Sequence, residues 1–486
     1  MLLELKEQAN LTQTENGAMA YRSTHSACLD LFAVSGALRH ADAHSIVQKF
    51  RRAYGEDPDT AMRILFYSRD VREGLGERRF FRIAVRDLAN THPDSVLRNL
   101  SLFAEYGRYD DLLCLLDTPC EAAAAALIRD QLNADLAAAK SGKNVSLLAK
   151  WLPSVNTSSP ETRAQAKQVC RLLGMRQKEY RRTLASLRAS IGIVEDSLRR
   201  GDYNFDYASM PGGAMLKYRR AILKHAGAHY RSYLINVKAG KAKMNTGNLY
   251  PYEIIRRAHF ETDPAMVESL DTMWNALPDF TDNRNALAVI DGSGSMYWSL
   301  EEGGVRPIDI ALSLGLYFAE HNRGHFAGHF ITFSETPRLV QVRGSNIAAR
   351  VWYCSAFDEA ANTNLYNTFM LILTTAIRHK LPQSELPELL YIISDMEFDV
   401  GVSRDKTVFE DVREKFEEWG YKMPQLVYWN VDARNEQYPV KMDTHGTALV
   451  SGASPRLFEQ MMSQELTPYS MMEQVLSSER YAAICA

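Results

Sequence analysis

Three separate stretches of this sequence carry oxygen-bearing side chains at spacings that suit a divalent cation. Mg²⁺ is a small hard cation that prefers about six oxygen ligands in octahedral geometry. The stretches supply carboxylates and hydroxyls, and they leave at least one position for water or for an acidic group of a partner. The predicted ligands are Asp291, Ser293, Ser295, Thr363 and Asp395.

The elements around these residues predict that they meet at one edge of a sheet. Asp291 directly follows the apolar run 286–290, and Asp395 directly follows the apolar run 389–394. Thr363 lies in the loop before a predicted helix. Because the carboxyl ends of parallel strands lie at the same edge, their loops meet over a common crevice.

The same residues allow two other interpretations. Acidic and hydroxyl side chains are common in turns and helix caps, where they bind no ion. Asp291 could also take part in phosphoryl transfer, which would make the protein a metal-dependent phosphoryl hydrolase. A nucleophilic serine needs a base, and no histidine lies near Ser293 or Ser295 in the sequence. We therefore expect a binding site and not an enzyme, with Mg²⁺ as the ion and Mn²⁺ or Ca²⁺ as alternatives for the same oxygens.

The C-terminal part, residues 281–486, alternates strand-like apolar runs with amphipathic helical stretches. This alternation predicts a Rossmann-like α/β domain whose mostly parallel sheet is covered by helices on both faces. The expected strands are 286–290, 327–333, 338–342, 389–394, 425–430 and 447–451. The expected helices are 307–322, 346–353, 365–379, 407–419 and 455–463.

Residues 1–280 show apolar residues at three- and four-residue spacing, which predicts helices joined by short turns. We expect an all-α, helical-repeat-like part that could form a ring, although the sequence has no clear repeat period. The fold class of the whole chain is therefore α+β and multidomain. The expected helices are 26–38, 43–53, 60–68, 79–89, 95–105, 110–116, 121–140, 163–173, 177–188, 191–199 and 212–235.

The net charge of −3 conceals a strong asymmetry between the two parts. Residues 1–280 carry 39 basic and 32 acidic side chains, and the remainder carries 17 and 27. Within the first part, residues 161–257 hold 20 basic and 7 acidic side chains. A concentrated positive charge suits a polyanion such as RNA, whereas the alternative is a set of solvated helix faces.

Candidate RNA contacts lie where basic side chains and an aromatic ring occur close together. Arginine and lysine neutralise phosphates, and aromatic rings stack on unpaired bases. Core packing is the alternative for the tyrosine, and a solvated face is the alternative for the lysines. The candidates are Lys217, Tyr218, Arg219, Arg220, Lys224, Lys238, Lys241 and Lys243.

Composition is that of an ordinary soluble globular protein, with 46% hydrophobic and 24% charged residues. No stretch approaches the roughly 18 continuous apolar residues of a membrane span, and the N-terminus lacks the features of a signal peptide. The six cysteines are scattered without metal-binding spacing, which favours reduced thiols. We therefore expect a cytoplasmic protein that does not associate with membranes.

Asp291-Gly-Ser293-Gly-Ser295, Thr363 and Ser394-Asp395 together resemble the metal-ion-dependent adhesion site of von Willebrand factor A domains. The resemblance implies that the C-terminal part is such a domain. In integrin-like members of the class, the ion accepts a carboxylate from a protein partner. A partner that supplies an Asp or Glu is therefore implied for this protein as well.

The other distinctive segments are 14–18, 66–79, 105–111, 148–153, 207–211, 217–220, 240–243, 429–430 and 451–455. They resemble a family of uncharacterised proteins found in plants, bacteria and large viruses. That family in turn looks like a relative of the TROVE-domain proteins, of which the Ro ribonucleoprotein is best known.

Ro-like proteins close a ring of helical repeats with an A domain, and they bind small noncoding RNAs and single-stranded 3′ ends. The resemblance implies an RNA-binding scaffold for a ribonucleoprotein or for RNA quality control. The resemblance does not extend to the individual residues with which Ro contacts RNA, because no matching motif is present. The alternative is a metal-dependent protein–protein interaction scaffold without nucleic acid.

Overall fold

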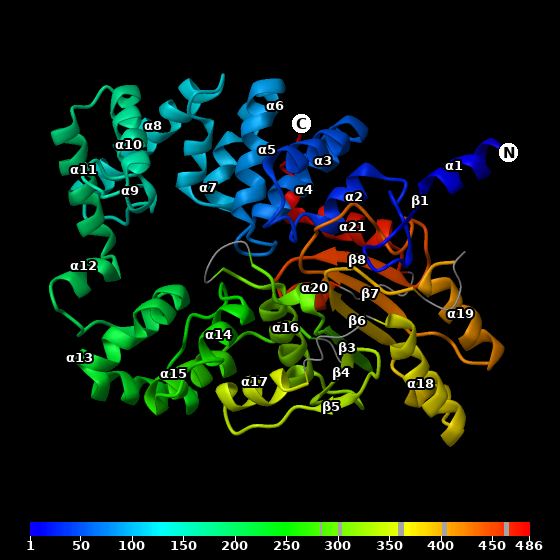
Figure 1. Cartoon of the computed structure of the whole chain (residues 1–486). Coiled ribbons are helices and arrows are strands. Elements are labelled where there is room, and N and C mark those ends of the chain that lie inside the picture. Colours follow the sequence, from blue (N-terminus) through cyan, green and yellow to red (C-terminus); the bar gives the residue numbers. More distant parts are fainter. Residues whose placement is uncertain (282–283, 300–303, 358–363, 401–405, 461–465) are drawn as a thin grey trace.

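The computed structural model describes residues 1–281, 284–299, 304–357, 364–400, 406–460 and 466–486. Helices dominate the chain up to residue 280, and a six-stranded sheet with its own helices follows (Figure 1). The architecture is therefore α+β, as the sequence predicts. Within the described part of the chain, no helix is both long enough and apolar enough to cross a membrane.

Two helices of the first part begin at local signals that the sequence contains. The Asp57 side chain caps α4, and the Ser159 side chain caps α10, in each case directly before a proline at the first helical position. The predicted helix 110–116 is the 3₁₀ helix η2 (Tyr109–Leu115). The α-helices are α1 (Leu2–Asn10), α2 (Ala27–Val34), α3 (Ala43–Glu56), α4 (Pro58–Arg69), α5 (Arg78–Thr91), α6 (Pro93–Arg98), α7 (Phe103–Tyr106), α8 (Glu121–Lys140), α9 (Leu148–Trp151), α10 (Pro160–Leu173), α11 (Gln177–Ile191), α12 (Val194–Arg199), α13 (Gly212–Lys238), α14 (Pro251–Ala258) and α15 (Pro264–Asn275).

A short hairpin interrupts the helices near the start of the chain. Its strands β1 (Leu11–Gln13) and β2 (Met19–Tyr21) pair antiparallel, so the prediction of an entirely helical first part is wrong here. The hairpin depends on the C-terminal part, because the backbones of Tyr21 and Tyr438 exchange hydrogen bonds of 2.9 and 2.8 Å. Periodicity within three-residue strands cannot reveal such a distant partner.

The helical part follows an arc whose last helices, α14 and α15, lie beside helices of the C-terminal part (Figure 1). Side chains at the start of α14 also contact loops near the first helices. The Tyr250 hydroxyl, at the start of α14, donates a 2.9 Å hydrogen bond to the carbonyl of Leu75. The Arg39 guanidinium lies 5.4 Å from the centre of the Tyr252 ring. We call residues 121–243, which include α8 to α13, the arm. The arm lies in the sequence between the first helices and α14.

The C-terminal sheet is mostly parallel, with the strand order β5-β4-β3-β6-β7-β8 and only β5 antiparallel to its neighbour. Every residue of β3 and β6 is buried. The strands are β3 (Ala286–Asp291), β4 (His329–Phe333), β5 (Leu339–Gln341), β6 (Leu389–Ser394), β7 (Gln425–Asn430) and β8 (Thr447–Ser451). The helices are α16 (Pro307–His321), α17 (Ile347–Ser355), α18 (Leu365–His379), α19 (Val408–Glu418), α20 (Leu457–Gln460) and α21 (Pro468–Leu476).

The strand order creates a switch point between β3 and β6. From β3 the chain passes through α16 to β4 on one side, whereas from β6 it passes through α19 to β7 on the other side. Right-handed crossovers in opposite directions place these helices on opposite faces of the sheet. The loops that leave the carboxyl ends of β3 and β6 therefore diverge and leave room for a ligand.

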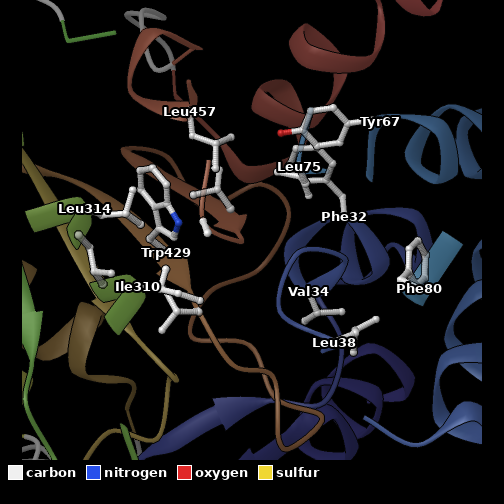
Figure 2. Close-up of a cluster of buried hydrophobic side chains, with 14 of the residues drawn as sticks. Phe32, Val34, Leu38, Tyr67, Leu75, Phe80, Ile310, Leu314, Trp429 and Leu457 are labelled. Atoms are coloured by element: carbon white, nitrogen blue, oxygen red, sulfur yellow. The ribbon is translucent and has the colours of Figure 1, made fainter. Parts of the chain in front are cut away.

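The two parts of the chain share one hydrophobic core. Figure 2 shows buried side chains from both parts, among them Phe32 and Tyr67 from α2 and α4, and Trp429 from β7. Gly36 allows the closest approach, because a Cβ atom there would lie 2.6 Å from the carbonyl oxygen of Ser451. The first helices and the sheet therefore form a single packed body.

Candidate metal centre and nucleic-acid surface

Asp291 ends β3 and is completely buried, with both carboxylate oxygens held in place. One oxygen accepts a 2.6 Å hydrogen bond from the hydroxyl of Ser394, the last residue of β6. The other oxygen accepts a 2.9 Å hydrogen bond from the backbone N–H of Ser293. The paired strands thus fix the carboxylate at the switch point.

The structure brings four of the five predicted ligands together. The hydroxyl oxygens of Ser293 and Ser295 lie 3.1 Å apart in the turn after β3. Asp395 is buried directly after β6, and a hydrogen bond from Ser295 acts on its carboxylate. Thr363 lies outside the described residues. The cluster joins two carboxylates to two hydroxyls, and these oxygens are the donors that Mg²⁺ prefers.

Electrostatics at this cluster favour the arrival of a cation. Burial and the negative charge of Asp395 raise the pKa of Asp291 to about 7. Burial also raises the pKa of Asp395, although the nearby guanidinium of Arg434 and the hydrogen bond from Ser295 act in the opposite direction. Two buried carboxylates at short range destabilise each other when both are charged, and a divalent cation between them would relieve this repulsion.

Hydroxyl oxygens are an essential part of this candidate centre. Nowhere in the described ranges do three or more His, Cys, Asp or Glu side chains gather in a way that suits a metal ion. A centre that needs only nitrogen, sulfur and carboxylate ligands, such as a structural zinc site, is therefore not visible among these residues.

Sequence reasoning missed two charged residues beside the cluster. Arg434 donates a 2.9 Å hydrogen bond to Asp395 from the loop after β7. Glu397 is buried on the loop after β6 and accepts a 2.7 Å hydrogen bond from the backbone N–H of Glu15. Both residues follow neighbouring parallel strands, and the loops after such strands all lie at the same edge of the sheet. Their position in the sequence could therefore have placed them near the predicted ligands.

The predicted RNA-contacting residues fall into two groups. Lys224, Lys241 and Lys243 are exposed on the arm. Lys217 is also exposed, and its ammonium group lies 4.8 Å from the centre of the Tyr218 ring. These side chains stay candidates for contact with a polyanion.

The second group is engaged within the protein. Arg219 is buried, its side chain donates a hydrogen bond to the carbonyl of Leu216, and burial lowers its pKa to about 10. The exposed Arg220 pairs with Glu261 at 3.4 Å, and Lys238 pairs with Glu268 at 2.8 Å. The hydroxyl of the half-buried Tyr218 donates to Glu195. Arg219 therefore cannot reach a ligand on the surface.

Two regular basic faces, on α10 and α11, were not singled out from the sequence. The spacing of four residues places Arg163, Lys167 and Arg171 on one face of α10, and all three are exposed. On the adjacent α11, Lys178, Arg181 and Arg182 are exposed at three- and four-residue spacing. Within the described part of the chain, none of these six side chains forms an ion pair.

A comparison with protein-family models shows to which protein family the chain belongs. The model described as domain of unknown function DUF2828 matches residues 14–122 and 115–280, more than half of the 486 residues. The chain belongs to the DUF2828 family. A second model, domain of unknown function DUF7788, matches residues 285–481 of this family member. The assignment of the C-terminal part as a von Willebrand factor A domain stays a prediction.

Two individual proteins resemble this DUF2828 protein over most of its length. The uncharacterized protein L728 of Acanthamoeba polyphaga mimivirus is 29% identical over 510 residues, which cover 96% of this chain and 87% of the relative. This viral relative fits the expected resemblance to an uncharacterised family. The crystal structure of the Ro (RSR) protein of Deinococcus radiodurans aligns with 94% of this chain and 100% of its own, with a TM-score of 0.37 and 12% identity.

Proposed function

We propose that this protein binds single-stranded RNA through the arm and holds Mg²⁺ at the sheet edge. The observation that supports RNA binding most strongly is the pair of exposed basic faces on α10 and α11. Residues 160–191 contain eight basic and two acidic side chains. Each lysine or arginine that neutralises a phosphate releases counterions, which drives binding without a requirement for sequence.

The arm suits an extended strand better than a duplex. Its basic side chains lie on α10, α11 and α13, and the half-buried rings of Tyr203 and Tyr218 belong to the same part of the chain. Aromatic rings stack on unpaired bases, which a duplex does not offer. Small noncoding RNAs with single-stranded regions and free 3′ ends are the corresponding ligand class.

The test compares two variants that remove the same charge. In the first, Arg163, Lys167 and Arg171 are changed to Gln. In the control, Arg343, Arg378 and Lys422, which are exposed on the C-terminal part, are changed to Gln.

Fluorescence anisotropy with single-stranded RNA should show that the first variant binds about 10- to 100-fold more weakly near 0.1 M salt. The slope of log K against log salt concentration should become shallower by about 2, since each lost contact contributes about 0.7. The control variant should match the wild type. Absence of binding by the wild type at 50 mM salt would exclude the RNA proposal.

The proposed ligands of the cation are Asp291, Ser293, Ser295 and Asp395, with Thr363 as the fifth by prediction. When bound, Mg²⁺ would supply a positive charge with an open position for an oxygen ligand. The test is calorimetric titration of Mg²⁺ into the wild type and Asp291→Asn, which keeps a similar side-chain shape. We expect the variant to lose at least about 100-fold in affinity, because it removes one of two buried charges. Equal affinities would contradict the proposed site.

A second candidate function is a metal-dependent contact with a protein partner. It is favoured by Trp298, which is 61% exposed and follows the turn that carries Ser293 and Ser295. A partner could place an Asp or Glu on the cation and an apolar group on this ring. Recovery of a protein partner after ribonuclease treatment, by the wild type but not by Asp291→Asn, would favour this function. Loss of all binding after ribonuclease treatment would favour RNA alone.

A further inference from the structure

The N-terminal segment 14–18 lies against the loop that follows Asp395 and is held there by several contacts. The Thr14 hydroxyl donates a 2.6 Å hydrogen bond to the carbonyl of Phe398. The Asn16 side chain donates a 2.7 Å hydrogen bond to the carbonyl of Glu397. Both acceptors belong to the loop that follows Asp395. We call residues 14–18 the strap.

Arg434 connects the strap to the metal centre through its two terminal nitrogens. One nitrogen lies 2.9 Å from a carboxylate oxygen of Asp395, and the other lies 3.2 Å from a carboxylate oxygen of Glu15. The Asp395 side chain is 1% exposed, whereas that of Arg434 is 31% exposed and that of Glu15 is 57% exposed. One guanidinium thus bridges a buried candidate ligand and a carboxylate at the surface.

The loop that carries Arg434 is fixed on both sides by residues from the start of the chain. His40 contacts Asp432 at 3.1 Å, and Lys49 contacts Glu436 at 2.7 Å. The next residue, Asn435, donates a 2.7 Å hydrogen bond to Glu397. Because its loop is anchored in this way and its guanidinium already contacts both carboxylates, Arg434 can withdraw from Asp395 toward Glu15 by a small side-chain movement.

We propose that Arg434 competes with the divalent cation for Asp395, and that Glu15 of the strap draws Arg434 away when the cation binds. This inference rests on the proposed metal centre. A guanidinium next to Asp395 offsets the negative charge that a cation needs, so it lowers cation affinity. With the cation bound, the guanidinium is repelled from the centre and its ion pair with Glu15 strengthens. Cation binding and strap docking therefore support each other, and the coupling is reciprocal.

The experiment titrates Mn²⁺ into the full-length protein and follows binding by calorimetry. Arg434→Gln should bind Mn²⁺ at least about tenfold more tightly than the wild type, because the competing charge is gone. Arg434→Lys should remain closer to the wild type. Glu15→Gln should bind several-fold more weakly, and this loss should disappear in the Arg434→Gln background. Arg378→Gln, which removes a remote exposed charge, should leave the affinity unchanged.

A second readout does not depend on affinity. Hydrogen exchange followed by mass spectrometry should show slower exchange of the strap when Mn²⁺ is added to the wild type. The same addition should not change the exchange of the strap in Arg434→Gln. Thermal unfolding of each variant would check that the chain is folded before either comparison is made.

The outcomes separate this inference from the proposed metal centre. If the wild type binds Mn²⁺ and Asp291→Asn does not, the centre stands, and unchanged or weaker binding by Arg434→Gln then overturns the competition. Weaker binding would show that Arg434 positions Asp395 for the cation. If the wild type binds no Mn²⁺, both the centre and the competition are wrong.

Discussion

The body of the molecule, formed by α2 to α7 and the sheet with its helices, holds its polar groups differently from the arm. In the body, several charged groups are buried and have partners that come from distant parts of the chain. Asp395, for example, contacts Arg434, which in turn contacts Glu15. On the arm, the basic side chains of α10 and α11 are exposed and follow the period of their own helices.

This difference indicates two kinds of chemistry in one chain. A buried cluster with fixed geometry suits a small ion, because such an ion gives up its hydration water only where protein ligands are already in place. An exposed basic face suits a long, flexible polyanion, because charge density decides the affinity and local geometry decides little. If body and arm are also separate in stability, a substitution in one should leave the other unchanged.

The largest expected effect comes from an ion pair inside the body. Asp70 is completely buried and pairs with Arg480, and it also accepts a 3.1 Å hydrogen bond from the Tyr481 hydroxyl. Asp70→Ala should lower the free energy of unfolding by about 3–5 kcal/mol, because it removes the only buried carboxylate that pairs with this largely buried guanidinium in the described residues and leaves it the exposed Glu105 and Glu73 at 3.6 and 4.0 Å. Urea unfolding followed by tryptophan fluorescence would measure the loss.

The matched control is Asp130→Ala, on the exposed face of α8. It should change stability by no more than about 0.5 kcal/mol. Equal effects of the two substitutions would show that the contact between α4 and residues 480–481 contributes little to the body.

A smaller and more local effect is expected in the arm. Leu184 is buried in α11, and Leu184→Ala should cost about 2–4 kcal/mol through lost burial and a cavity. If the arm opens as its own cooperative unit, hydrogen exchange should accelerate in residues 160–191 and stay unchanged in β6 and β7. Faster exchange in all three segments would mean that arm and body unfold together.

The buried parts of the fold could be predicted well from the sequence, because their signals are local. The runs at β3, β6 and β7 consist of apolar residues between polar turns, and the structure has strands there. The order of these strands then placed Asp291 and Asp395 at the same edge. By contrast, the contact between Glu15 and Arg434 joins a residue near the start of the chain to one in the C-terminal part. No local sequence pattern predicts such a contact.

The basic residues predicted to contact RNA do not share one helix face, because their spacing is too short for that. Lys217, Arg219 and Arg220 are almost consecutive, and consecutive residues point in different directions around a helix with 3.6 residues per turn. One of them had to face inward, and Arg219 does. Arg163, Lys167 and Arg171 lie at steps of four residues, which indicates one helix face and could have been predicted from the sequence.

The smallest expected effect concerns the junction where the helical part returns to the body. Gly76 has a φ of +67°, and a Cβ atom there would lie 2.0 Å from the Tyr250 hydroxyl oxygen. Gly76→Ala should therefore destabilise the protein through both backbone strain and this overlap, by about 2 kcal/mol. Tyr250→Phe alone should cost about 1 kcal/mol, since it removes the hydrogen bond to Leu75.

The double variant decides whether the junction is rigid. Removal of the hydroxyl also removes the closest contact and leaves the ring carbon Cζ 3.1 Å from the added Cβ atom. The combined loss should therefore be about 1 kcal/mol smaller than the sum of the single losses. Gly142→Ala is the control for strain alone, because Gly142 has a φ of +65° and an added Cβ atom would meet nothing within 4 Å. Its effect should add to that of Tyr250→Phe. If the Gly76 and Tyr250 effects also add, the hydroxyl moves aside freely, and the arm is joined to the body less firmly at this end than the contact with Leu75 implies.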